Sequence, residues 1–118
     1  MKYIFYKEVI ETTGTVILGV MPEEERINVL FRFSDSGWTT QKIQEIIDKV
    51  ESNRSLEKTK NPYVWGNEDV TVFANELGVL LVDKLAMRAK QEVEPLELTH
   101  DEFITFMKDF KKFIEENS

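Results

Sequence analysis

The pair of residues best suited to proton transfer is His100-Asp101, which contains the only histidine of the chain. A histidine beside a carboxylate can act as a general acid, a general base or a metal ligand. His100 follows Thr99, however, which is placed to cap a helix, and the first turn of a helix is normally solvated. No second histidine is present to complete a His-rich metal site. We therefore interpret this pair as part of a helix start without a catalytic role.

Carboxylates are abundant, with 22 acidic residues among 118. Two of them can serve a glycosidase, and a cluster can bind a cation through oxygen atoms. The sequence contains no calcium-loop spacing, no P-loop, no dinucleotide-binding fingerprint and no glycine-flanked nucleophilic serine. It contains no cysteine, which excludes disulfides, thiolate nucleophiles and cysteine-ligated zinc or iron–sulfur sites. We predict a non-enzyme with no catalytic residue, no metal site and no cofactor.

The residues best suited to binding a partner are acidic or aromatic. Three glutamates are consecutive in one loop, and three more lie shortly before the C-terminal helix. Each tryptophan adjoins a turn glycine, and tryptophan is favoured at interface hot spots because it combines a large apolar area with an N–H donor. The candidate partner-binding residues are Glu23, Glu24, Glu25, Trp38, Trp65, Glu92, Glu94 and Glu97. The alternatives are a solvated loop for the consecutive glutamates and a cap on the core for each tryptophan.

The charge of the chain narrows the class of partner. With 15 basic residues against 22 acidic ones, the formal net charge is −7, which opposes general attraction to phosphate backbones. Lys108, Lys111 and Lys112 cluster near the end, but acidic neighbours dilute them. No stretch approaches the ~20 apolar residues of a membrane span, and charge returns too early for a signal peptide. We expect a cytoplasmic protein with no nucleic-acid or membrane partner.

The elements that must position these residues begin with three expected strands. Residues 3–11 are aromatic and β-branched, and Thr13-Gly14 can form the turn into an apolar strand over 15–21. Residues 27–33 alternate in polarity, which predicts a third strand and completes a meander. The side chains of this third strand expected to face the core are Ile27, Val29, Phe31 and Phe33.

A helix and a second group of strands are expected next. Apolar residues at helical spacing predict a helix from Thr39 or Thr40 to about Ser52. Residues 53–61 are polar and are expected to form an exposed connection. Residues 63–75 predict a hairpin that turns at Gly66-Asn67, and 76–84 a further strand. Residues 86–91 fit either a helix or a loop.

The C-terminal helix has the strongest amphipathic pattern. Thr99 and Glu102 have the spacing of a capping box, which satisfies backbone N–H groups at a helix start. The apolar stripe that follows consists of Phe103, Phe106, Met107, Phe110, Phe113 and Ile114. Since each large apolar side chain stabilises the fold by about 1.5 to 3 kcal/mol when fully buried, this helix is expected to anchor the core.

Together these elements predict one α+β domain over residues 1–118. We expect an antiparallel sheet of about five to six strands, a meander plus a hairpin, packed with two main helices of which the second is C-terminal.

Three segments resemble the small bacterial YacL-like proteins: Val70 to Leu77, Asp101-Glu102-Phe103 and Phe110-Lys111-Lys112-Phe113. The shared pattern is a Val-x-Val-x-Ala-Asn-x-Leu strand that leads through an acidic loop to an aromatic C-terminal helix. The chain departs from it by carrying Lys84, Arg88 and Lys90 where the pattern is acidic and aromatic. YacL-like proteins have no established catalytic residues, so the resemblance implies a protein that is not an enzyme.

In size, acidity and lack of cysteine the chain is also similar to immunity proteins of bacterial contact-dependent inhibition systems. This resemblance implies a cytoplasmic protein that binds and blocks a cognate toxin domain as a heterodimer, commonly a nuclease with a basic substrate groove. We therefore expect a non-catalytic acidic binding protein, most simply such an immunity protein. The alternative is a YacL-like housekeeping adaptor or regulator with an unknown partner.

Overall fold

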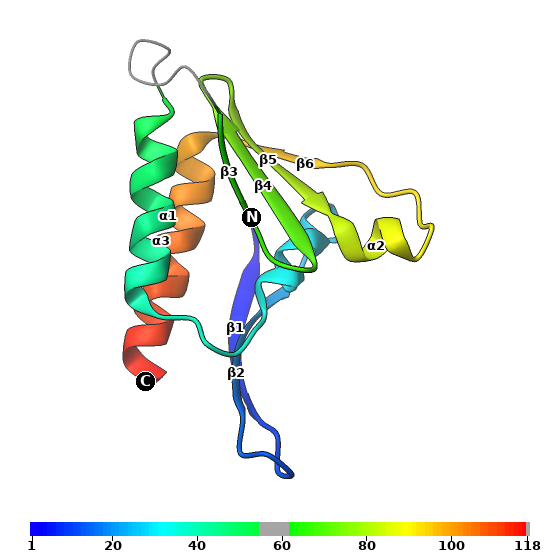
Figure 1. Cartoon of the computed structure of the whole chain (residues 1–118), viewed down its shortest axis with the longest axis vertical. Helices are drawn as coiled ribbons and strands as arrows, with labels where there is room; N and C mark the ends of the chain where they lie inside the picture. Colours follow the sequence, from blue (N-terminus) through cyan, green and yellow to red (C-terminus); the bar gives the residue numbers. More distant parts are fainter. Residues whose placement is uncertain (55–61, 118) are drawn as a thin grey trace.

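The computed structural model describes residues 1–54 and 62–117, and within them the chain is α+β, as predicted. Two antiparallel strands, β1 (Tyr3–Val9) and β2 (Val16–Pro22), form one sheet. A second antiparallel sheet has the order β3 (Tyr63–Gly66), β4 (Val70–Asn75), β5 (Gly78–Asp83) and β6 (Leu96–Leu98). The helices are η1 (Glu25–Phe33), α1 (Thr40–Ser52), α2 (Lys84–Arg88) and α3 (His100–Asn117). Figure 1 shows α1 and α3 side by side on one side of the second sheet, while the turn end of β1 and β2 projects from the body.

The core lies between α3, α1 and the inner face of the β3–β6 sheet. Phe103, Phe106 and Phe110 of α3 are fully buried, as the apolar stripe predicts. The predicted capping box is present: the Glu102 backbone N–H donates to Thr99 Oγ1 over 3.1 Å, and the Thr99 N–H donates to Glu102 Oε1 over 2.9 Å. The inner face of the sheet contributes a set of fully buried side chains, Val70, Val72, Ala74 and Leu81.

The two ends of the chain meet in this core. Phe5 of β1 stacks on Phe110 of α3, with ring centroids 5.4 Å apart. The Tyr3 hydroxyl donates to Asp109 Oδ2 over 2.6 Å, which links residues 106 positions apart. The first strand is therefore held in place by the last helix.

The expected third strand over residues 27–33 is wrong, because this segment forms the 3₁₀ helix η1. Ile27, Leu30 and Phe33 are fully buried and recur every third residue, which matches the three-residue turn of a 3₁₀ helix. Phe31, expected in the core, is 39% exposed, and Val29 is buried. The predicted meander is therefore a two-stranded hairpin followed by a helix. Pairing continues beyond it only as an isolated bridge between Leu18 and Asp35 within the described residues.

The later elements follow the prediction more closely: a helix is one of the two forms expected for residues 86–91, and a short strand at Leu96–Leu98 is an addition. The strands expected within 63–75 and 76–84 are present as β3, β4 and β5. Residues 84–88 form the short helix α2, whose first turn is capped by Asp83 accepting from the Ala86 N–H over 3.0 Å. The acidic loop before α3 contains β6, which pairs with β5 so that Leu98 lies opposite Val79. With three residues, this strand is too short to show an alternating pattern.

The connection after α1 differs at its start from the exposed segment expected there. Asn53 is buried, and its side-chain amide donates to the Lys49 carbonyl over 2.8 Å. Residues 55–61 lie outside the described residues. The start of α1 agrees with prediction, since Thr39 Oγ1 accepts from the Lys42 N–H over 3.1 Å.

Candidate functional site

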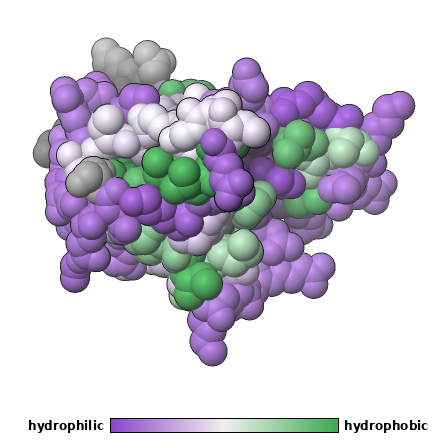
Figure 2. Space-filling view, turned by 90° about the horizontal axis from the view of Figure 1, so that it is seen from below, coloured by the Kyte–Doolittle hydropathy of each residue, from purple (hydrophilic) through white to green (hydrophobic). Residues whose placement is uncertain are grey.

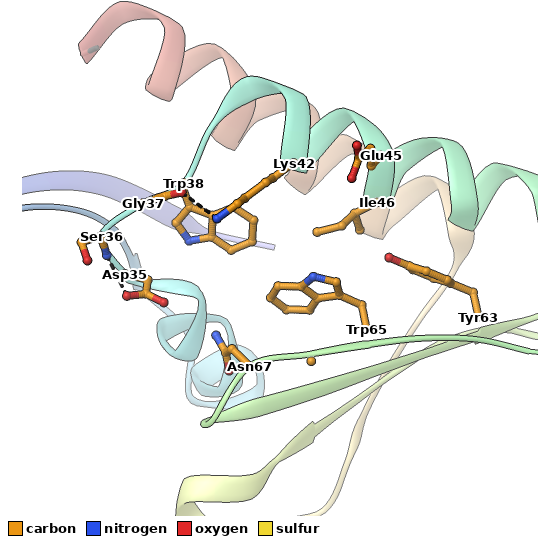
Figure 3. A pocket seen from close by; sticks show the side chains of 11 residues that line it. Asp35, Ser36, Gly37, Trp38, Lys42, Glu45, Ile46, Tyr63, Trp65 and Asn67 are labelled. Carbon is orange, nitrogen blue, oxygen red and sulfur yellow. Dashed lines mark hydrogen bonds between the residues drawn. The ribbon is translucent and has the colours of Figure 1, made fainter.

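The two candidate tryptophans lie together in one hollow of about 330 Å³, which we call the aromatic hollow. Trp38 comes from the segment before α1 and Trp65 from β3, and their ring centroids are 5.5 Å apart. Figure 3 shows the two indole rings between α1 on one side and Asp35 and Asn67 on the other. The remaining wall includes Tyr63 of β3. The structure thus unites two residues that the sequence suggested separately.

The core fixes the position of both indoles. Phe33, which is fully buried, stacks on Trp65 with centroids 5.7 Å apart and planes 5° apart. Trp38 Nε1 donates to the Phe33 carbonyl over 2.6 Å, and the Trp38 ring also meets Phe110 at 5.5 Å. Both tryptophans are half-buried. They therefore both cap the core, as the alternative interpretation has it, and present part of their surface to solvent.

Charged groups flank the rings of the aromatic hollow. Asp35 and Glu45 supply carboxylates, and Lys42 supplies an ammonium group whose Nζ donates to the Gly37 carbonyl over 3.0 Å. The pKa of Tyr63 is raised above its ordinary value, first by burial of the ring and then by the negative charge of Glu45. The hollow therefore combines aromatic surface with an excess of one negative charge.

A second hollow, of about 440 Å³, unites two of the acidic segments, and we call it the acidic hollow. Its lining includes Glu25 of η1 and both Glu92 and Glu94 from the connection between α2 and β6. These three glutamates are exposed. Arg26 and Arg32 also line it. Segments far apart in the sequence thus place three carboxylates around one depression.

The wall of the acidic hollow rests on an ion pair between η1 and the end of β5. Arg32 Nε donates to both carboxylate oxygens of Asp83, over 3.0 and 3.1 Å, and the Asp83 side chain is only 7% exposed. Asp83 also caps α2, as described above. This carboxylate therefore joins three elements, η1, β5 and α2.

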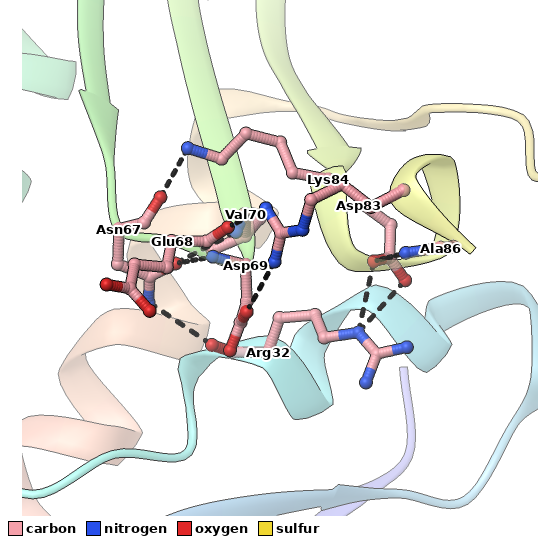
Figure 4. Close-up of polar contacts among 9 residues, drawn as sticks. Arg32, Asn67, Glu68, Asp69, Val70, Asp83, Lys84 and Ala86 are labelled. Atoms are coloured by element: carbon pink, nitrogen blue, oxygen red, sulfur yellow. Dashed lines mark hydrogen bonds and ion pairs between the residues drawn. The ribbon is translucent and has the colours of Figure 1, made fainter. Parts of the chain in front are cut away.

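A network of polar contacts continues from this ion pair to the β3–β4 turn (Figure 4). Asn67 Oδ1 accepts from the N–H groups of Asp69 and Val70, both over 2.8 Å, and Asn67 Nδ2 donates to the Arg32 carbonyl over 3.3 Å. Lys84 Nζ donates to the Asn67 carbonyl. In the described part of the chain, no buried side-chain nitrogen or oxygen lacks a hydrogen-bond partner. The sequence predicts a turn at Gly66-Asn67, but no local pattern indicates that the Asn67 amide reaches η1.

The other candidate glutamates lie apart from the two hollows. Glu23 is exposed, and Glu24 Oε2 accepts from the Lys2 backbone N–H over 2.6 Å, so that neither lines the acidic hollow. Glu97 lies on β6 and lines a separate hollow of about 340 Å³ together with Phe73 and Leu77. The eight candidate residues therefore belong to several places on the surface.

The outer face of the β3–β6 sheet bears apolar side chains that sequence reasoning did not single out. Val64, Phe73, Leu80 and Glu97 lie opposite one another across the four strands. Phe73 is 39% exposed, and Leu77 in the β4–β5 turn is 86% exposed. The sequence signal for this face was Phe73, a large apolar residue. It alternates with the buried Val70, Val72 and Ala74 of the same strand and so lies on the opposite face. Elsewhere, apolar patches interrupt a hydrophilic surface when the molecule is seen from below (Figure 2).

The His100-Asp101 pair takes part in structural contacts. His100 Nε2 lies 2.7 Å from the Asn75 carbonyl oxygen, which joins α3 to the end of β4. Asp101 accepts a hydrogen bond from Arg54, and this bond and the arginine charge lower the pKa of the Asp101 carboxyl. Across residues 1–54 and 62–117, no three histidine, aspartate or glutamate side chains are grouped to hold a metal ion. Among the same residues, no helix has the length and apolarity to cross a membrane.

Comparisons of the chain with protein-family models, with curated proteins and with solved structures each return no match. The resemblance to YacL-like proteins stays a prediction that rests on the three segments quoted above. The resemblance to immunity proteins stays a prediction that rests on size, acidity and lack of cysteine. Function is therefore inferred from the surfaces just described.

Proposed function

We propose that this protein is a non-catalytic binding protein whose acidic hollow covers a basic region of a protein partner. The observation that carries this proposal is the convergence of Glu25, Glu92 and Glu94 on one depression, although they come from segments distant in sequence. Opposed potentials speed the encounter of two proteins, and charge pairs that lose water on docking fix their relative orientation.

The charge balance of the acidic hollow supports a basic occupant. Arg32 is already paired with Asp83, so that Arg26 is the remaining positive side chain of the lining against three exposed glutamates. The net charge of −7 extends this preference to the molecule as a whole. A partner with a basic groove matches both the local and the overall charge.

The specific role that we propose is that of a cytoplasmic immunity protein that forms a heterodimer with a cognate toxin domain and blocks its substrate groove. This role joins the charge argument to the resemblance noted in the sequence. A nuclease must carry positive charge where it binds phosphate, and an acidic protein can occupy that surface without catalysing anything. Interfaces of this kind bury about 800 Å² on each partner, far more than one hollow, so neighbouring surface would also take part.

A YacL-like adaptor or regulator is the second candidate, and the outer face of the β3–β6 sheet favours it. Val64, Phe73 and Leu77 are apolar and exposed there. Permanent interfaces are more apolar than transient ones, so this face suits a lasting protein partner. A gene for a large secreted effector directly upstream would favour the immunity role over this one.

The test begins with capture of the partner from the native host and its identification by mass spectrometry. Association rates are then measured by stopped flow at increasing salt for the chain and for a variant with Glu25, Glu92 and Glu94 all changed to Gln. We expect rates to fall with salt, and the variant to associate about tenfold more slowly at low salt.

The matched control changes Glu8, Glu11 and Glu76 to Gln, because these exposed glutamates lie outside the acidic hollow and carry the same total charge. This control should keep most of the association rate at low salt. Equal rates at all salt concentrations, or an equal loss in both triple variants, would reject the acidic hollow as the binding surface.

A further inference from the structure

Both tryptophans of the chain line the aromatic hollow. Their rings are held in place before any ligand arrives, because Phe33 packs against both of them and Trp38 Nε1 donates to the Phe33 carbonyl over 2.6 Å. Side chains fixed in this way lose little conformational entropy when a ligand binds. The half-buried rings thus offer a preorganised aromatic surface.

The carboxylates beside these rings define the charge of the ligand. Asp35 Oδ1 accepts only from the neighbouring Ser36 N–H, over 2.8 Å, and neither Asp35 nor Glu45 forms an ion pair with a lysine or arginine of the described residues. Lys42 is the cation of the lining, and its ammonium is turned to the Gly37 carbonyl. The remaining negative charge disfavours an anion and favours a cation.

We propose that the aromatic hollow receives the guanidinium of an arginine side chain presented by the protein partner. A guanidinium stacks on aromatic faces and donates hydrogen bonds in a planar fork that suits a carboxylate. Trp38 and Trp65 supply the faces, and Asp35 and Glu45 supply the acceptors on the two sides of the rings (Figure 3). An ammonium group is more strongly hydrated and lacks the planar shape, so lysine binds less well.

The size of the hollow fits this occupant. A volume of about 330 Å³ lies at the lower end of the range for pockets that take a small molecule, which is enough for one long side chain. The inference rests on the proposed function in one respect, since a partner with a basic surface must supply the arginine. It adds a point of specificity outside the acidic hollow.

The experiment titrates the whole protein with the peptide acetyl-Gly-Arg-Gly-amide. Both tryptophans line the aromatic hollow, so their fluorescence and their two indole N–H signals in NMR report on binding there. Trp38 also borders a neighbouring hollow, so a shift of the Trp65 indole signal is the specific readout. We expect saturable changes in both signals. The same peptide with citrulline, which keeps the shape of arginine and removes its charge, should bind at least about fivefold more weakly.

Variants identify the groups responsible. Asp35→Asn and Glu45→Gln should each weaken binding of the arginine peptide by about threefold or more, and Lys42→Met should strengthen it by removing a competing positive charge. Glu11→Gln is the matched control, because it removes the same charge at an exposed residue outside both hollows and should leave the peptide affinity unchanged. Thermal melting of each variant confirms that it is folded.

The inference is overturned by the absence of a saturable signal, by equal binding of the citrulline peptide, by carboxylate variants that match Glu11→Gln, or by weaker binding to Lys42→Met. Its failure is distinct from failure of the proposed function. A partner that still associates in a salt-dependent manner through Glu25, Glu92 and Glu94 would leave that function standing while the arginine site is rejected.

Discussion

The aromatic and acidic hollows are built in opposite ways. The rings of the aromatic hollow belong to the core, since Trp38 and Trp65 contact Phe33 and Trp38 also meets Phe110. The glutamates of the acidic hollow are exposed and rest on a polar framework that centres on the Arg32–Asp83 pair. A change in the first is therefore expected to lower stability as well as the proposed binding. Changes at the rim of the second are expected to leave stability unaltered.

The variant with the largest expected effect on stability is Phe110→Ala in α3. Phe110 is fully buried and contacts both Phe5 and Trp38, so its loss leaves a cavity beneath the aromatic hollow. We expect the free energy of unfolding to fall by about 3 to 5 kcal/mol in a denaturant melt, with altered tryptophan emission in the native state. Phe73→Ala on the exposed sheet face is the control and should cost less than about 1 kcal/mol. A loss below about 1 kcal/mol for Phe110→Ala would contradict its place in the core.

The framework of the acidic hollow is tested by Arg32→Ala. This change leaves the Asp83 carboxylate buried without its ion-pair partner, while its bond to the Ala86 N–H remains. Since Arg32 is itself 23% exposed, we expect a loss of about 1 to 3 kcal/mol in the free energy of unfolding, less than for a fully buried pair. Arg88→Ala breaks the more exposed pair with Asp69 and should cost less than about 1 kcal/mol. Similar losses in the two variants would mean that burial of Asp83 adds little to the contribution of its ion pair to the free energy of unfolding.

The two hollows should also differ in their response to alkali. The pKa of Tyr63 is raised in the folded state from the ordinary value of 10.0, so the unfolded chain releases this proton at lower pH than the folded one. The stability that goes with the neutral phenol is therefore complete below pH 10 and is lost as pH rises through the folded pKa. Denaturant melts at increasing pH should show a smaller alkaline loss for Tyr63→Phe than for the parent chain. Equal losses would show that Tyr63 ionises alike in both states.

The smallest expected effects on stability come from the consecutive glutamates. Glu23→Ala and Glu25→Ala each remove one exposed charge and should change the free energy of unfolding by less than about 0.5 kcal/mol. Only Glu25 of these two lines the acidic hollow, so its removal should slow association with the partner more than removal of Glu23 does. Binding rates of the two variants under identical salt provide the measurement. Equal slowing would indicate that overall charge matters and position does not.

The parts of the fold that the sequence predicts well are those governed by local patterns. The stripe from Phe103 to Ile114 and the reciprocal bonds of Thr99 and Glu102 depend on neighbours within a few residues. The prediction for residues 27–33 is wrong because two burial patterns share their end residues. A strand buries every second residue and a 3₁₀ helix every third, and both patterns include Ile27 and Phe33. Leu30, buried in η1, is the residue that separates the two patterns.

The candidate site was predictable by residue type and not by position. Tryptophan beside a turn glycine marks a place suited to contact, but the approach of Trp38 to Trp65 depends on how α1 and β3 pack. Likewise, Glu25 and Glu92 share a hollow because Arg32 and Asp83 join η1 to β5 across 51 residues. Such long-range placement follows from tertiary packing, for which a single sequence carries no periodic signal.

The contact between β1 and α3 has a consequence for how the protein is made. The Tyr3–Asp109 bond and the Phe5–Phe110 stacking cannot form until the C-terminal helix has left the ribosome. Contacts of such long sequence separation form late, because a long loop must close first. A nascent chain halted before α3 therefore lacks the contacts that hold its first strand in place.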